Sequence, residues 1–337
     1  MSLRKFLWLA ALGALLQGLA GGARAQVDYS VYGVADFSYG RFEPSGLLPA
    51  NRFNSNSMTA SFVGVNLSDG LDGGWKPGLT LETFVRFQDF KTGRNDRDPL
   101  LSRNAFVFLN SRFGNVQLGR LQTLLFNVTT RFNAFGNSVA FSPAVRHLFA
   151  AGNLEGVQGD FYWDRALGYQ SPKLFENTTL SLMHAQGSSD ERGSYNGGTV
   201  VFAQGVGAIS FSAQHVSVFN GIDTPIAETA WQLGGSYNFG IAQVFGQLSA
   251  TADGGLGVHS RIATGGVKWA IGPGYVLAQV AATRASGAAV DRRQTTASAG
   301  YLYSYDSQTD FYLVGMNDRV SGQTNGVSVA AGVRLQF

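Results

Sequence analysis

The sequence of 337 residues contains no cysteine, only 8 prolines and few charged residues. Without cysteine, the chain cannot have a disulfide framework, a thiol nucleophile, a cysteine-ligated zinc site or a lipid anchor on an N-terminal cysteine. Charged residues make up 14% of the chain, whereas a soluble domain has roughly 25%. Apolar residues still make up 45%, which excludes a disordered chain.

The first 25 residues have the three parts of a secretory signal peptide. Arg4 and Lys5 form a short positive region, Phe6–Leu16 is an unbroken apolar run, and an Ala-Arg-Ala triplet ends at Ala25. The apolar run is short for a spanning helix, so an uncleaved membrane anchor is the weaker interpretation. We therefore expect residues 1–25 to be removed, leaving a single domain.

The signal peptide changes the meaning of the formal net charge of +3. Three of the 25 basic residues and none of the 22 acidic residues lie in it, so the mature chain has 22 of each sign. The apparent basicity is no reason to expect nucleic acid as a partner. Of the mature basic residues 18 are arginine, whose planar guanidinium suits carboxylates and phosphates. This preference fits anionic solutes, lipid phosphates, or both.

From Val27 onward, apolar residues recur at every second position, which is typical of strands. No later segment has about 18 apolar residues in a row, which excludes helical membrane spans. Most of the predicted strands have the ~9–11 residues that a tilted strand needs to cross a bilayer. We predict about sixteen of them, at 27–40, 59–69, 76–90, 101–112, 114–121, 163–171, 178–187, 195–204, 208–219, 228–239, 242–252, 258–269, 274–285, 292–304, 309–317 and 325–337.

The connections between these strands alternate in length. Short turns such as Arg112–Gly114 and Gly205–Gly207 alternate with longer polar loops such as Arg41–Ser57 and Lys91–Pro99. Short turns at one end and long loops at the other are typical of a transmembrane β-barrel, and aromatic residues gather at the strand ends as expected there. The sequence therefore predicts an all-β fold, an antiparallel transmembrane barrel over residues 26–337.

One connection, about 121–162, is far longer than the others and is rich in phenylalanine. A structureless loop of this length is usually functional. A barrel of sixteen strands has a lumen wide enough for an aqueous channel. We expect the loop to fold into the lumen and narrow it, since phenylalanines favour packing against a wall. A surface excursion is the alternative.

The chain resembles the general trimeric porins of Gram-negative outer membranes, in particular those of β-proteobacteria. The resemblance rests on the order and spacing of short motifs: Tyr32-Gly33-Val34-Ala35-Asp36, Gly64-Val65, Arg103-Asn104-Ala105-Phe106-Val107, Phe113-Gly114-Asn115-Val116, Leu118-Gly119-Arg120, Tyr169-Gln170-Ser171-Pro172 and Gly332-Val333-Arg334 with terminal Phe337. It implies a homotrimer in the cell outer membrane that passes small hydrophilic solutes and ions passively. It further implies that Phe337 helps the barrel-assembly machinery recognise the chain.

The resemblance also implies a pore constriction in which basic wall residues face acidic residues across the lumen. Its expected members are Arg103, Arg165, Glu82 and Arg86 on the wall, and Arg131, Arg146 and Glu155 on the inward loop. Val34 and Phe62 stand where relatives often have basic residues, and the family's acidic loop motif is absent. With Arg103 and Arg165 on the wall, we expect a mild anion preference.

Other sites are weakly supported. The four histidines show no metal spacing, and we expect neither a metal nor a cofactor. Asp96 and Asp98 could touch calcium, but a solvated loop is the simpler interpretation. In relatives the loop matching Lys91–Pro99 holds the neighbouring subunit.

Two other functions are possible. An outer-membrane barrel enzyme, such as a protease or phospholipase, would show a paired catalytic motif, and the chain has neither G-x-S-x-G nor H-E-x-x-H. A secreted β-rich adhesin would need a soluble surface, which the low charge argues against. We therefore expect a channel and no enzyme.

Cell fractionation tests the barrel against the secreted protein. Because outward apolar faces need lipid, we expect the protein in the membrane fraction, soluble only after detergent is added. Recovery from the aqueous periplasmic fraction without detergent would contradict the barrel.

Overall fold

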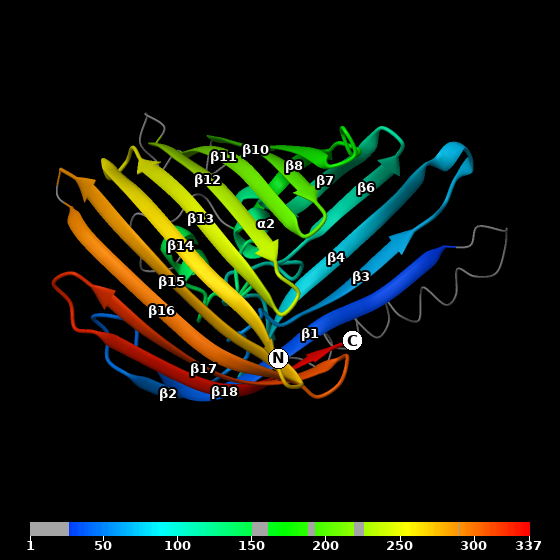
Figure 1. Ribbon diagram of the computed structural model, residues 1–337. Helices are drawn as coiled ribbons and strands as arrows, with labels where there is room; N and C mark the ends of the chain where they lie inside the picture. The colour runs from blue at the N-terminus through cyan, green and yellow to red at the C-terminus, as the bar shows by residue number, and fades with distance from the viewer. Residues whose placement is uncertain (1–26, 150–160, 188–192, 219–225, 289) are drawn as a thin grey trace.

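The computed structural model describes residues 27–149, 161–187, 193–218, 226–288 and 290–337, so the predicted signal peptide lies outside it. The described residues form sixteen long strands, each antiparallel to its neighbours, that close into a barrel (Figure 1). These strands are β1 (Asp28–Phe42), β3 (Phe62–Ser68), β4 (Lys76–Arg86), β6 (Ala105–Ser111), β7 (Gly114–Gln122), β8 (Tyr162–Gln170), β9 (Thr178–Gln186), β10 (Gly193–Gln204), β11 (Gly207–Val218), β12 (Ile226–Asn238), β13 (Ala242–Asp253), β14 (Val258–Ile271), β15 (Gly274–Gly287), β16 (Asp291–Ser304), β17 (Thr309–Val320) and β18 (Gly326–Gln336).

The strands fall where the two-residue alternation predicts them. The largest differences are at β4 and β6, which are shorter than the predicted ranges 76–90 and 101–112. Two short strands in long loops were not predicted, β2 (Ala50–Asn54) and β5 (Lys91–Thr92), nor was a 3-10 turn, η1 (Asp72–Gly74). No helix in the described part of the chain is long and apolar enough to cross a membrane.

The barrel closes at β1. This strand pairs with β3 over Asp28–Val34 and with β18 over Val34–Arg41, so the first and last strands of the chain are neighbours. Phe337 completes the seam, because the amide of Gly33 donates to its carbonyl at 2.9 Å and its own amide donates to the carbonyl of Gly33 at 3.2 Å. The ring of Phe337 covers Gly33, where a Cβ would lie only 2.6 Å from the ring.

The two faces of each strand differ in polarity. On β12 and β13, Gln232, Gln247 and Ser249 are buried on the lumen side, whereas Trp231 and Leu248 are exposed on the outside. Long strands that are apolar outside and polar inside are the pattern of a membrane barrel with a polar interior.

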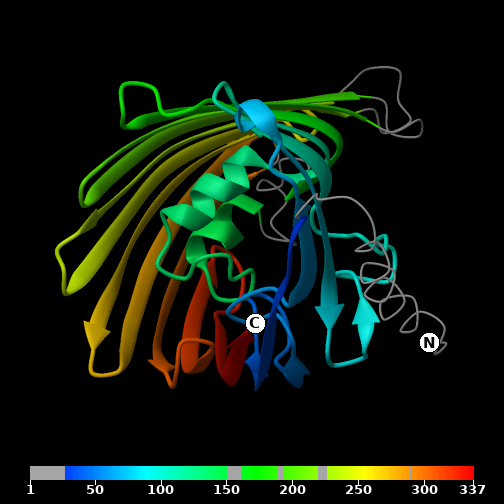
Figure 2. The same cartoon turned by 90° about the vertical axis from the view of Figure 1, so that its right-hand side faces the viewer.

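The long connection folds into the lumen, as predicted, over its described part. It forms two short helices, α2 (Leu124–Arg131) and α3 (Pro143–Phe149), that lie inside the barrel (Figure 2). Thr123 caps α2 by accepting a hydrogen bond from the amide of Phe126 at 3.3 Å. The helices were not predicted, because eight and seven residues are too few for a helical period to stand out in the sequence.

Polar side chains of the wall hold α2. Gln247 donates hydrogen bonds to the carbonyls of Thr129 at 2.8 Å and Phe132 at 2.7 Å, which satisfies groups that the helix end leaves without a partner. Phe132 is fully buried and its ring lies over Gly234 of β12, where a Cβ would come within 2.9 Å of the ring. The absence of a side chain at Gly234 therefore lets the helix lie close to the wall.

Three contacts hold α3. Arg146 forms an ion pair with Asp318 of β17 at 3.3 Å. The ring of His147 lies between Thr283 (Nδ1 to Oγ1, 2.6 Å) and Thr296 (Nε2 to Oγ1, 2.7 Å). Since the hydroxyl of Thr296 donates to Asp318, it accepts from His147, and Nε2 therefore bears the proton of the neutral ring.

The buried His147 makes the stability of the barrel depend on pH. Burial lowers the pKa of His147 to about 3, and Arg146 and Arg292 act in the same direction, against the nearby Asp318. A histidine that folding keeps neutral stabilises the protein fully above its unfolded pKa of about 6.5, and this stability is lost as the pH falls toward the folded value. From pH 7 to 5, the loss is about 2 kcal/mol.

Denaturant unfolding of the detergent-refolded barrel at pH 7 and pH 5 measures this loss. The His147→Gln variant has no such group, so we expect its free energy of unfolding to fall less than that of the wild type. The control is His259→Gln, at an exposed histidine of β14, which keeps the wild-type dependence. Equal pH dependence of the wild type and His147→Gln would contradict the role of His147.

Candidate functional site

Glu82 of β4 is the centre of a polar cluster on the lumen wall. It is buried and accepts hydrogen bonds from Tyr32 at 2.6 Å and Asn104 at 2.6 Å. Arg103 forms an ion pair with the same carboxylate and donates its backbone amide to the carbonyl of Glu82 at 3.3 Å. The structure thus brings together two residues predicted for the constriction, as a pair whose charges cancel.

Phe62 has a specific partner in this cluster. The guanidinium of Arg103 lies over its ring, 3.9 Å from the centroid. A cation over an aromatic face is attracted by the ring quadrupole. The position where relatives often have a basic residue therefore holds Arg103 in place without adding a charge.

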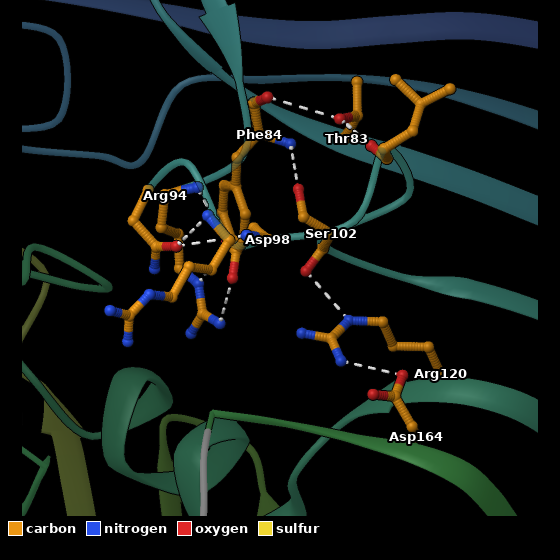
Figure 3. A network of polar contacts seen from close by, with 10 residues as sticks. Thr83, Phe84, Arg94, Asp98, Ser102, Arg120 and Asp164 are labelled. Carbon is orange, nitrogen blue, oxygen red and sulfur yellow. Dashed lines mark hydrogen bonds and ion pairs between the residues drawn. The ribbon is translucent and has the colours of Figure 1, made fainter.

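A second polar network links the loop after β4 to the wall (Figure 3). In that loop Arg94 binds Asp98 at 2.8 Å. Ser102 accepts the amide of Phe84 at 3.2 Å through its hydroxyl, and its carbonyl accepts Arg120 Nε at 2.9 Å. Burial raises the pKa of Asp98, but the hydrogen bonds and charge of Arg94 lower it more, so the pKa lies below its ordinary value.

Arg120 belongs to this network and was not predicted as a site residue. It is buried, forms an ion pair with Asp164 at 2.8 Å, and lies over the ring of Tyr162. Simple alternation puts it on the same face as the exposed Val116 and Leu118. A bulge between β7 and β8 changes the register there, so alternation alone could not find it.

Arg165 lies on the other side of the same bulge. Its backbone has a φ of 51°, in the left-handed region, and its side chain is exposed. It forms no ion pair with another described residue, and Arg120 occupies the network beside it. Its place at the constriction stays a prediction.

The other predicted residues have different surroundings. Arg86 pairs with Asp89 at 3.4 Å and with Asp96, so it is tied to the second long loop and not to Glu82. Arg146 is the anchor of α3 described above. Glu155 lies outside the described residues. Their roles at the constriction are therefore still predictions.

Arg131 lines a cavity of about 290 Å³ between the inward loop and the wall. The cavity is also lined by Lys268 of β14 and Arg334 of β18. Arg334 binds Asp310 at 2.6 Å, whereas Arg131 and Lys268 form no ion pair with a described residue; Lys268 lies over the ring of Tyr275 at 4.0 Å. The cavity therefore has an excess of positive charge.

Asp36 of β1 lies beside the seam, and its carboxylate binds several neighbouring segments of the wall. It is fully buried and accepts the amides of Ser57, Met58 and Thr59 at 3.0–3.1 Å, and the hydroxyl of Tyr312 at 2.8 Å. These bonds fold the segment between β2 and β3 against the inward loop, where Ser138 donates to the carbonyl of Ser57 at 2.5 Å. Within the described ranges, no group of three or more histidines and acids could hold a metal ion.

Comparison with known proteins fits this geometry. Residues 9–323 match the family described as Gram-negative porin. Outer membrane porin protein 32 of Delftia acidovorans is 29% identical over 248 residues, and the match covers 69% of this chain and 66% of the relative, just under two thirds of its length.

Solved structures share the fold. An anion-selective porin from Comamonas acidovorans has a TM-score of 0.78 at 20% identity, covering 93% of this chain and 100% of that chain. A trimer form of OmpT from Vibrio cholerae has a TM-score of 0.67 at 12% identity, covering 92% and 99%. With a family match over most of its length, a closed barrel and a polar lumen narrowed by an inward loop, the chain belongs to the Gram-negative porins and is an outer-membrane porin.

Proposed function

We propose that this porin is a passive, water-filled channel for small hydrophilic solutes and ions that prefers anions. The observation that supports the preference is the cavity beside the inward loop. Arg131, Lys268 and Arg334 line it, and the carboxylate of Asp310 compensates only Arg334. Fixed charges in a narrow polar passage select ions of the opposite sign.

Three other arginines of the lumen wall and loop are compensated by carboxylates. Arg103 is paired with Glu82, Arg120 with Asp164, and Arg146 with Asp318. Since these pairs add no net charge, Arg131 and Lys268 are the cations without an ion pair to a described residue among those that line the cavity beside the loop. The Comamonas protein is named an anion-selective porin, which agrees with the proposal. That this chain catalyses no reaction stays a prediction.

Selectivity in a planar bilayer tests the proposal. Under a gradient of dilute KCl, we expect the reversal potential of the wild type to show chloride preference. A unit charge about 4 Å from an ion contributes about 1 kcal/mol in water, a factor of about five. The Arg131→Gln, Lys268→Gln double variant should therefore lower the chloride-to-potassium permeability ratio at least about fivefold.

One control removes two positive charges far from the cavity, and another removes a negative charge from the lumen wall. Arg112→Gln with Lys173→Gln removes two exposed charges at the short-turn end and should leave the ratio nearly unchanged. Glu82→Gln frees Arg103 and should raise the ratio, whereas Arg103→Gln or Arg165→Gln should lower it.

A cation-preferring wild type, or a double variant that behaves like the wild type, would overturn the anion preference. A protein that gives no conductance steps would overturn the channel.

We also propose the assembly that the resemblance implies: export through a cleaved signal peptide, recognition of Phe337 by the assembly machinery, contact with lipopolysaccharide, and a homotrimer. The OmpT structure named a trimer form supports the last of these. In the second long loop, Lys91 pairs with Asp96 and Arg94 with Asp98, and Arg86 at the end of β4 also pairs with Asp96. Phe90 and Leu100 are exposed, so this loop can contact a neighbouring subunit through apolar side chains.

Light scattering in mild detergent tests the trimer. We expect the wild type to have three times the mass of one chain. Phe90→Ser with Leu100→Ser should shift the protein toward monomer, because two exposed apolar groups of the loop are lost. Phe175→Ser, at a 93% exposed phenylalanine of a short turn, is the matched control. A wild type that runs as a monomer would contradict the trimer, and an unchanged double variant would contradict the loop contact.

A further inference from the structure

Three arginines lie in one row across neighbouring strands. Arg261 of β14 is directly opposite Arg284 of β15, which is directly opposite Arg293 of β16. Residues directly opposite each other in an antiparallel pair have Cβ atoms about 4.5–5.5 Å apart. The side chains of the three arginines therefore leave the sheet side by side.

The row lies on the outer face of the barrel. All three arginines are exposed, and the residues that flank them along the strands, Ile262, Thr283 and Gln294, are buried on the lumen side. Each arginine is within four residues of the end of its strand at the long-loop side. The rise of about 3.4 Å per residue places the row near the outer boundary of the membrane.

Within the described part of the chain, no carboxylate compensates these charges. Like charges directly opposite each other destabilise a sheet, yet none of the three forms an ion pair with a described residue. Asp291 lies two residues before Arg293 on the same face and is exposed, without an ion pair to it. Three adjacent uncompensated cations at a lipid boundary are complementary to an anion from outside the chain.

An apolar groove continues from the row. It has a volume of about 630 Å³ and is lined by the three arginines, by Trp231 and Leu248, and by small residues such as Ala263 and Ala282. Ala263 and Ala282 are opposite each other, two residues from Arg261 and Arg284 on the same face. Their small side chains leave room between the bulky residues and the arginines. The surface is thus charged toward the outer boundary and apolar toward the middle of the membrane.

We propose that this surface, formed by Arg261, Arg284, Arg293 and the adjoining groove, binds a phosphorylated lipid of the outer leaflet. The phosphate lies across the guanidinium row, where forked N–H groups donate to its oxygens. An acyl chain lies in the groove against Trp231 and Leu248. The inference rests on the proposed lipopolysaccharide contact and on an orientation in which the longer loops face the outside of the cell, as in bacterial outer-membrane barrels. It gives the lipid contact a definite place.

Two other occupants are less complementary. Free phosphate matches the arginines but makes no use of the apolar groove. A second copy of the chain would have to bring carboxylates against the row and apolar groups into the groove at the same time. A single amphiphile satisfies both parts of the surface.

Binding of bisphosphorylated lipid A to the purified porin in detergent tests the site, with dephosphorylated lipid A as the matched probe. We expect Arg261→Gln with Arg284→Gln and Arg293→Gln to weaken binding of the phosphorylated lipid at least about tenfold, since each arginine near an anionic lipid surface strengthens binding by a factor of about five. Ala263→Trp fills the groove and should weaken binding of both lipids. The control is Arg41→Gln with Arg97→Gln and Arg112→Gln, which removes three exposed arginines elsewhere and should bind like the wild type.

Several results would overturn the site. These are equal binding by the arginine triple variant and the wild type, no preference for the phosphorylated lipid, or full competition by inorganic phosphate at millimolar concentration. Loss of the trimer in the triple variant, without a change in lipid binding, would make the row a subunit interface. The triple variant should keep the wild-type ion selectivity, and Arg131→Gln with Lys268→Gln should keep lipid binding. Failure of the lipid site is thereby distinguishable from failure of the channel.

Discussion

The structure depends on one constraint, which is that backbone N–H and C=O groups find no water in the hydrocarbon layer. They must therefore pair with one another, and a sheet can do so completely only if it has no free edge. Here the last edge disappears where β18 meets β1 and Phe337 bonds to Gly33 in both directions. The alternation of side chains and the polar lumen follow from a sheet that faces lipid on one side and water on the other.

The lumen of this barrel is packed with polar side chains, unlike the apolar core of a soluble protein. The inward loop rests on the glutamines, threonines and carboxylates of the wall, and each of its helices is held by polar contacts as well as by buried phenylalanines. Gln247 donates hydrogen bonds to the carbonyls at the end of α2, and Thr283 and Thr296 form hydrogen bonds with the ring of His147 in α3. A polar wall can thus hold a loop firmly and still leave a wet passage beside it.

The barrel could be predicted from the sequence because its period is simple. Trp231, Leu233 and Leu248 alternate with Gln232, Gln247 and Ser249, and one rule places all of them. The candidate site follows no such rule. Arg120 is buried by a bulge, Arg103 is neutralised by Glu82, and Lys268 matters because a segment more than a hundred residues away, around Arg131, lies against it. These are consequences of irregular backbone and long-range contact, which a local pattern does not contain.

The seam at β1 also sets a condition on how the chain can fold. The contact between Gly33 and Phe337 joins the first strand to the residue that follows the last strand, so the ring closes only when all the strands are present and in register. Contacts of such sequence separation are costly in chain entropy and form slowly. Until then β1 and β18 are both open edges, able to pair with the strands of another chain. The two strands that pair at the seam of the finished barrel are therefore the edges at which an unfinished barrel can aggregate.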